Sequence, residues 1–103
     1  MRLWIDDVRP MPDGFDRHAK TASEAIEVIK ACDRIEEISF DHDLGNDADG
    51  TGYDVAKFIE QQAYYGTKPP PLKWAIHSAN PVGRENIRKA MESAERFASL
   101  DKE

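Results

Sequence analysis

The sequence predicts a small α/β domain in which a parallel sheet is flanked by helices. Short apolar runs typical of strands, at 2–5, 37–40 and 73–77, alternate with segments of helical periodicity. The connections between these strands are a dozen or more residues long, which is the length that right-handed parallel crossovers require. We expect the three strands to be adjacent in that order. A chain of 103 residues suffices for one core, so we assign 1–103 to a single domain.

The first half of the chain contains a loop, a weak strand and a helix. Two prolines and an Asp-Gly pair make the segment after the first strand a loop, and 15–20 is expected to form a second strand. Thr21 and Glu24 have the spacing of a capping box. They begin a helix whose apolar face continues through Ile29 and Cys32.

The second half repeats the alternation of strand and helix. After the central strand comes a polar loop at 41–50, in which we interpret Asp47 and Asp49 as solvated residues. A helix then runs from Thr51 to Gly66, a residue typical of helix ends. The last helix follows the third strand, with an asparagine cap and a proline in its first turn, and 99–103 is expected to be a frayed tail.

The composition excludes several classes of function. A net charge of −6 argues against a surface that binds nucleic acid passively, since such a surface needs a basic stripe. The single cysteine, Cys32, rules out a disulfide framework and a zinc-thiolate site. No apolar run approaches the ~20 residues of a membrane span, and the first strand runs into two aspartates, unlike a signal peptide. We expect a cytoplasmic protein with no membrane partner and no stable nucleic-acid binding.

Acidic side chains stand where the predicted strands end. Asp6 and Asp7 follow the first strand, Asp41 and Asp43 follow the central strand, and the third strand also ends in polar residues. Ligands of open parallel sheets bind outside the carboxyl ends of the strands, so these endings predict one shared site. Neighbouring carboxylates repel one another unless a cation intervenes, and Mg²⁺ (or Mn²⁺) is the simplest such cation. We predict Asp6, Asp7, Asp41 and Asp43 as its ligands.

Two histidines lie beside these predicted site residues. His42 follows Asp41, and His77 precedes Ser78 at the end of the third strand. A histidine can act as general acid or base near neutral pH, so both are candidate catalytic residues. The alternative for each is a structural hydrogen bond that orders the loops.

A candidate phosphate site lies at the start of the last helix. Ser78 supplies a hydroxyl, Asn80 an amide, and Arg84 a planar guanidinium in the first turn, where free N–H groups also attract anions. Arg9 is a second candidate clamp from the loop after the first strand. The alternative for both arginines is a surface salt bridge.

Three motifs together resemble the receiver domains of response regulators, which have a flavodoxin-like fold. They are Asp6-Asp7 after the first strand, Asp41-His42-Asp43-Leu44-Gly45 after the central strand, and Gly52-Tyr53-Asp54 at the next helix. The resemblance implies that the paired acids and the central aspartate hold Mg²⁺. It also implies that Asp41 is the equivalent of the phosphoryl acceptor and that the Ser78 hydroxyl contacts phosphate.

A narrower similarity comes from the third strand ending. The run His77-Ser78-Ala79-Asn80-Pro81-Val82-Gly83-Arg84, taken with the other motifs, is similar to the cyclic-phosphate-processing receiver-like family over roughly residues 2–90. The fold this implies is truncated relative to a full receiver. No helix fits between the first strand and Phe15, and no lysine-bearing strand follows Ser78.

Three hypotheses of function follow. The first is a metal-dependent phosphoesterase that acts on a cyclic phosphate or a related nucleotide phosphate, with His42 or His77 handling the proton. The second is a signalling module phosphorylated on Asp41, against which the missing lysine strand counts. The third is a metal- or phosphate-binding module without turnover. The oligomeric state is left open.

Overall fold

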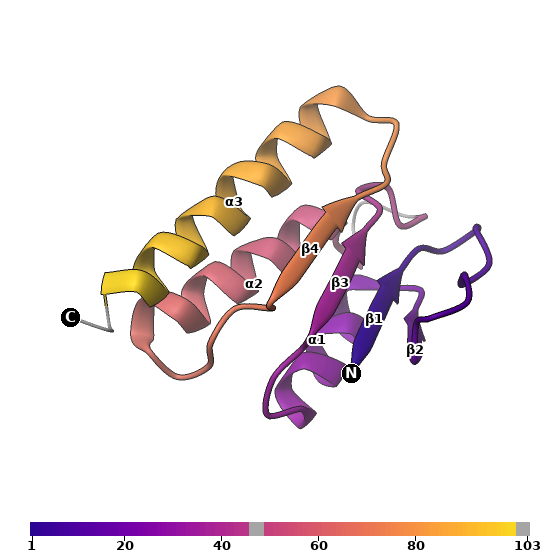
Figure 1. Ribbon diagram of the computed structural model, residues 1–103. Helices are drawn as coiled ribbons and strands as arrows, with labels where there is room; N and C mark the ends of the chain where they lie inside the picture. The colour runs from indigo at the N-terminus through magenta and orange to yellow at the C-terminus, as the bar shows by residue number, and fades with distance from the viewer. Residues whose placement is uncertain (46–48, 101–103) are drawn as a thin grey trace.

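A four-stranded parallel sheet forms one layer of the molecule, and the helices form the other (Figure 1). The computed structural model describes residues 1–45 and 49–100. The strands in that part of the chain are β1 (Arg2–Ile5), β2 (Arg17–Ala19), β3 (Glu37–Phe40) and β4 (Lys73–Ile76). The helices are α1 (Ala22–Ala31), α2 (Gly52–Tyr65) and α3 (Pro81–Leu100).

The strand order is β2-β1-β3-β4, with each neighbouring pair parallel. The predicted adjacency of the first, central and third strands is therefore confirmed. The predicted second strand exists but is only three residues long and lies at the edge of the sheet beside β1. As expected, no helix lies between β1 and β2.

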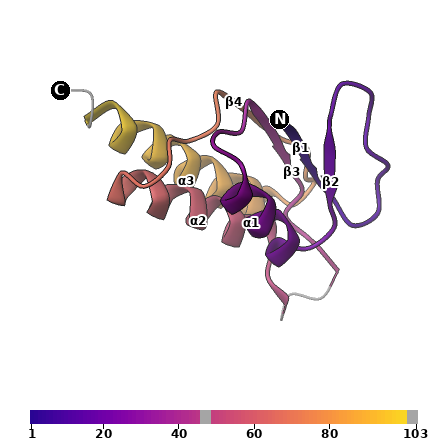
Figure 2. The same ribbon diagram turned by 90° about the horizontal axis from the view of Figure 1, so that it is seen from below.

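The strand order explains why all three helices lie on one face of the sheet (Figure 2). The crossovers from β2 to β3 and from β3 to β4 run in the same direction across the sheet, so right-handed connections place α1 and α2 on the same side. The connection from β1 to β2 runs the other way and is a loop. The direction of the chain therefore reverses at β1, and the carboxyl ends of β1 and β3 form a topological switch point.

The two faces of the sheet have different contents. On the helix side, Leu3 and Ile5 of β1 and Ile38 and Phe40 of β3 are fully buried in the core. Their neighbours of opposite parity point to the other face. There, Trp4 packs edge-on against Phe15 of the β1–β2 loop, with ring centroids 5.3 Å apart. The loop thus gives this face part of the cover that a helix would otherwise provide.

The helix ends follow the sequence signals closely. The Thr21 hydroxyl accepts a hydrogen bond from the Glu24 N–H at 3.1 Å, as the predicted capping box requires. Thr51 and the third helical residue form a second capping box, and Gly66 ends α2 in the left-handed region at φ 69°.

The end of α3 and the polar loop can be compared with the predictions. Helix α3 includes Ser99 and Leu100, the first two residues of the predicted frayed tail, and 101–103 lie outside the described residues, so the fraying stays a prediction. Asp49 is exposed, as expected of a solvated loop residue, whereas Asp47 falls outside the described part of the chain. None of the described helices is long and apolar enough to cross a membrane.

Lys68 ties the connector before β4 to the end of α1. Its ammonium donates to the carbonyl oxygens of Ile29 at 2.8 Å and Lys30 at 3.2 Å, and also to that of Cys32. These carbonyls belong to the last turn of α1 and its C-cap residue, where the regular helical hydrogen bonds run out. The Ile29 carbonyl also accepts the Cys32 N–H, at 3.3 Å. A cation is favourable at this negative end of the helix dipole.

We therefore expect Lys68→Met to lower the free energy of unfolding by about 1–2 kcal/mol, because it removes charge-assisted hydrogen bonds without removing the apolar stem. Urea denaturation followed by circular dichroism measures the change. Lys20→Met, at an exposed position before α1, is the matched control and should differ from the parent protein by less than about 0.5 kcal/mol. Equal stability of the two variants would contradict the capping role.

Candidate functional site

Asp6 is the most deeply buried charged residue at the carboxyl end of the sheet, with none of its surface exposed. Its Oδ1 accepts hydrogen bonds from the backbone N–H groups of Val8 and Arg9, both at 2.8 Å. These bonds turn the chain away from β1 and hold one carboxylate oxygen in place. The other oxygen, Oδ2, lies 2.9 Å from Nε2 of His77.

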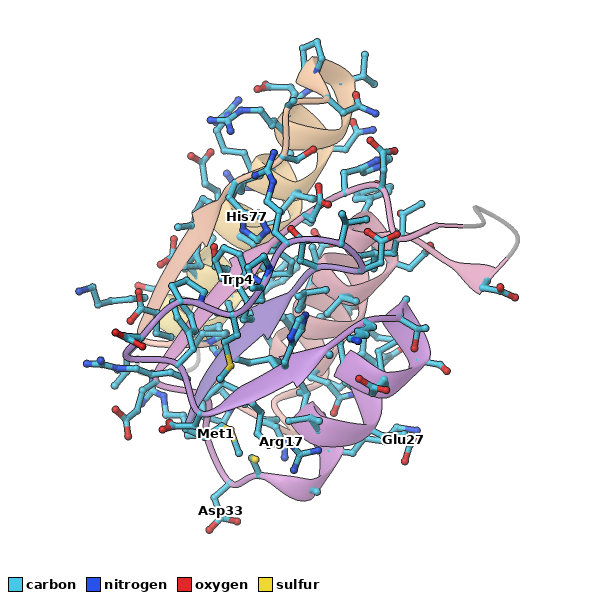
Figure 3. All side chains as sticks on the ribbon, turned by 90° about the vertical axis from the view of Figure 1, so that its right-hand side faces the viewer. Met1, Trp4, Arg17, Glu27, Asp33 and His77 are labelled. Carbon is cyan, nitrogen blue, oxygen red and sulfur yellow. The ribbon has the colours of Figure 1, made fainter. Side chains whose placement is uncertain are left out.

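His77 is held from several sides immediately after β4. Its Nδ1 lies 2.8 Å from the Ser39 hydroxyl, and its backbone N–H bonds to the Phe40 carbonyl in β3. The ring stacks on Trp4 with centroids 3.9 Å apart and planes 3° from parallel. Figure 3 labels these two side chains, which lie next to each other. Arg9 donates to the His77 carbonyl at 2.8 Å. Contacts at both ring nitrogens and on the ring face therefore fix the orientation of the imidazole.

Asp41 follows β3 in the centre of the same edge. Its Oδ1 accepts from the His42 N–H at 2.9 Å. Helix α2 begins close by, since the Gly52 N–H bonds to the His42 carbonyl at 2.9 Å. A Cβ at position 52 would overlap the Asp41 carbonyl, so only glycine allows the helix to approach this closely.

The three strand endings bring Asp6, Asp41 and His77 together. One ligand atom from each lies within 4.8 Å of the other two. Burial raises the pKa of Asp41 above its ordinary value, and the charge of Asp6 raises it further; hydrogen bonds from the His42 N–H and the Ser78 hydroxyl offset this only in part. The raised pKa thus reflects a carboxyl group that is partly buried next to a second negative charge.

The pKa shifts of the other two groups also result from burial and hydrogen bonding. Burial opposes ionisation of Asp6, but the hydrogen bonds from Arg9, Val8 and His77 outweigh it and lower the pKa. Burial lowers the pKa of His77 against the pull of the two carboxylates. Near neutral pH the cluster therefore combines two carboxylates with a neutral imidazole. These are donors that suit a divalent cation, so the residues present fit a bound metal.

The predicted metal ligands are only partly brought together. Asp6 and Asp41 belong to the cluster, but Asp7 and Asp43 are not among the groups that converge. The Asp7 carboxylate lies beside Gly45, 3.5 Å from where a Cβ would stand. Asp43 is exposed and its Oδ1 lies 3.0 Å from Nδ1 of His42. Alternation accounts for Asp7, since consecutive residues at a strand end point in different directions. Asp43 is two residues from Asp41 and lies in the loop after β3, where strand alternation no longer applies.

His42 lies at the rim of the site and contacts the start of α3. Its side chain is largely buried, and a Cβ at Gly83 would overlap the imidazole ring. Nδ2 of Asn80 lies 3.5 Å from both His42 Nδ1 and Asp43 Oδ1. The same Asn80 caps α3, because its Oδ1 accepts from the Gly83 N–H at 2.9 Å. The cap that the sequence predicts is present.

Of the predicted phosphate-binding residues, Ser78 lies beside the cluster, whereas Arg84 contacts the backbone. Ser78 is buried, accepts from the Asn80 N–H at 3.1 Å and hydrogen-bonds the Asp41 side chain. Arg84 instead donates to the carbonyls of Ile76 and Ser78, both at 3.0 Å. Its guanidinium holds the end of β4 and lines a hollow of about 510 Å³ together with Ser78. Arg84 was expected to face the carboxylates and bind phosphate, but in this structure its guanidinium binds backbone carbonyl groups.

Three residues of this network were not identified from the sequence. Ser39 and Trp4 lie inside two of the predicted strands, and both contact His77. His18 lies in the predicted second strand, and its Nε2 is 2.7 Å from the Asp6 carbonyl oxygen. These three residues are brought together by the register of the strands, because Trp4 pairs with both Ser39 and His18 across the sheet.

A model of the cyclic-phosphate processing receiver domain matches residues 1–93 of the chain. No curated protein and no solved structure matches this chain.

The raised pKa of Asp41 leads to a prediction about stability without metal. Because the folded carboxyl binds its proton more tightly than the unfolded chain does, ionisation destabilises the fold as pH rises above 3.8. Asp41→Asn should therefore raise the free energy of unfolding at pH 7 in the presence of a chelator. The gain should shrink as pH falls toward 3.8, where wild-type Asp41 is increasingly protonated. Urea denaturation across pH 4–7 measures it, and a variant less stable than wild type at pH 7 would contradict the argument.

Proposed function

Because the chain belongs to the cyclic-phosphate processing receiver family, we propose that it is a metal-dependent phosphoesterase acting on a cyclic phosphate or a related nucleotide phosphate. The observation that carries the proposal is the convergence of Asp6, Asp41 and His77 at the carboxyl ends of three parallel strands. In open α/β sheets this is the edge where ligands bind. The excess negative charge there also favours a cation as the partner of an anionic substrate.

Asp6 and Asp41 would hold the metal. A bound divalent ion supplies a Lewis acid for the phosphoryl oxygens and lowers the pKa of a bound water. Asp6 is suited to this role because its Oδ1 is already fixed by two backbone N–H groups, leaving Oδ2 directed into the cluster. Ser78 orients Asp41 through a hydrogen bond to its side chain. Both carboxylates are therefore positioned before any ligand arrives.

His42 is the better candidate to handle the proton. Its Nδ1 lies 3.0 Å from the Asp43 carboxylate, which would fix the orientation of the ring as the third group does in nucleophile–base–acid arrangements. His77 has both ring nitrogens in short hydrogen bonds, which leaves no nitrogen for substrate. In hydrolysis, water forms the new P–O bond and one ring ester P–O bond breaks. His42 would take a proton from the attacking water and return it to the leaving alkoxide.

The start of α3 supplies contacts for the phosphate. Asn80 Nδ2 faces the His42–Asp43 pair, and the hollow beside Ser78 is lined by Arg84, Glu85 and Arg88. A phosphate at the rim would meet the Asn80 amide, and an anionic group reaching into the hollow would meet the guanidinium groups of Arg84 and Arg88. Nucleotide phosphates and cyclic phosphates are the ligands this arrangement suits.

A signalling role with Asp41 as phosphoryl acceptor is a second candidate, since Asp41 occupies the acceptor position of the family pattern. In the described residues, however, β4 is followed only by α3, and no fifth strand brings a lysine to the site. A binding module without turnover is the third. The activity measurement separates the candidates.

We expect hydrolysis of at least one member of a panel of 2′,3′-cyclic, 3′,5′-cyclic and monoester phosphates in the presence of Mg²⁺ or Mn²⁺, and none with a chelator. Asp41→Asn should lower turnover at least about 100-fold. Asp33→Asn is the matched control, because Asp33 is exposed at the opposite end of the sheet from His77 (Figure 3) and should retain full activity.

Absence of turnover with the whole panel would overturn the phosphoesterase proposal. Incorporation of phosphate or beryllofluoride at Asp41 would then favour the signalling module. Metal binding without either result would favour the binding module.

A further inference from the structure

We propose that His77 is itself a ligand of the metal, through Nε2, and that the site therefore selects dications of the Mn²⁺ to Zn²⁺ class over Mg²⁺. The inference rests on the proposed function only in taking the cluster to hold a divalent cation. It changes the predicted ligand set from four carboxylates to two carboxylates and one imidazole.

The spacing of the groups supports direct ligation. Two ligand atoms at right angles, each about 2.1 Å from an octahedral ion, lie about 3 Å apart. Nε2 of His77 and Oδ2 of Asp6 are 2.9 Å apart. The pair thus already has the separation of neighbouring ligands on one ion. Asp41 completes a group of three whose ligand atoms all lie within 4.8 Å.

The far side of the imidazole is also arranged for ligation. A metal-bound histidine nearly always uses its second ring nitrogen in a hydrogen bond to an oxygen, which fixes the tautomer. Nδ1 of His77 lies 2.8 Å from the buried hydroxyl of Ser39. A hydroxyl can donate or accept, so Ser39 serves either tautomer without moving. A change of tautomer therefore frees the Nε2 lone pair of His77 from its bond to Asp6 and makes it available to a metal.

The surroundings keep the ring in the orientation that ligation needs. Trp4 is buried and lies flat against the imidazole, and Arg9 holds the His77 carbonyl. Because the ring is already fixed, binding a cation costs little side-chain entropy. A histidine that only balanced the charge of Asp6 would not need the hydrogen bond between its Nδ1 and Ser39.

The donor set determines which cation is favoured. Mg²⁺ prefers oxygen ligands and retains several waters, whereas imidazole suits the first-row transition metals. One nitrogen ligand beside two carboxylates therefore shifts the preference toward Mn²⁺, Fe²⁺, Co²⁺ or Zn²⁺.

Pulsed electron paramagnetic resonance of the Mn²⁺-loaded protein tests the ligation directly. We expect modulation from a directly bound ¹⁴N nucleus, replaced by the ¹⁵N pattern when the histidines are ¹⁵N-labelled. His77→Asn replaces the nitrogen by a neutral oxygen and should abolish the coupling. Bound Mn²⁺ without nitrogen coupling, or coupling that persists in His77→Asn, would overturn the inference. So would failure of Mn²⁺ to bind.

Calorimetry tests the selectivity. In wild type Mn²⁺ should bind at least about tenfold more tightly than Mg²⁺, and His77→Asn should reduce this ratio at least about fivefold. An unchanged ratio would overturn the proposed selection.

Trp4 supplies a second readout that requires no change at His77. In a Trp74→Phe background, Trp4 is the one remaining tryptophan of the two in the chain, so its fluorescence reports on the stacked imidazole. Zn²⁺ should change this fluorescence, and an unaltered spectrum at saturating Zn²⁺ would count against ligation. Nitrogen ligation without hydrolysis of any phosphate would leave the inference standing and reject the phosphoesterase activity instead.

Discussion

The buried carboxylate of Asp6 is the constraint on which this end of the molecule depends. An ionised group with no exposed surface is tolerated only when its oxygens are satisfied. The loop after β1 turns so that two backbone N–H groups reach one oxygen, and β4 places His77 against the other. The positions of the loop and of the end of β4 are therefore both coupled to one charge. Asp41, beside this charge, carries the electrostatic cost that a cation would remove.

The one-sided arrangement of helices determines what lies around the site. The helices α1, α2 and α3 all cover the same face (Figure 2). The opposite face therefore carries Trp4, Ser39 and His77, which contact one another, rather than helix side chains. A full receiver has helices on both faces, and here a loop with Phe15 takes over part of that cover. The space that a helix would fill is instead available for a polar network next to the carboxylates.

Close approach of helix termini shapes the rim of the site. Gly52 and Gly83 are positions where a side chain would overlap Asp41 or His42. The two helices are thereby brought against the strand ends, and Asn80 is placed within reach of His42 and Asp43. The site is thus built from strand ends and the first turns of helices, all of which are rigid parts of the fold.

The sequence by itself determined the sheet, the helix ends and the edge at which the site lies. These features can be predicted from local signals, each of which spans only a few residues. The signals are hydrophobic periodicity, the capping residues, and the positions of Asp6 and Asp41 at strand ends. Only the tertiary structure decided which side chains converge. Asp7 and Asp43 lie one or two residues from true members of the cluster and point elsewhere. Ser39 reaches His77 only because β3 and β4 pair in one register, which sets contacts between residues 38 positions apart.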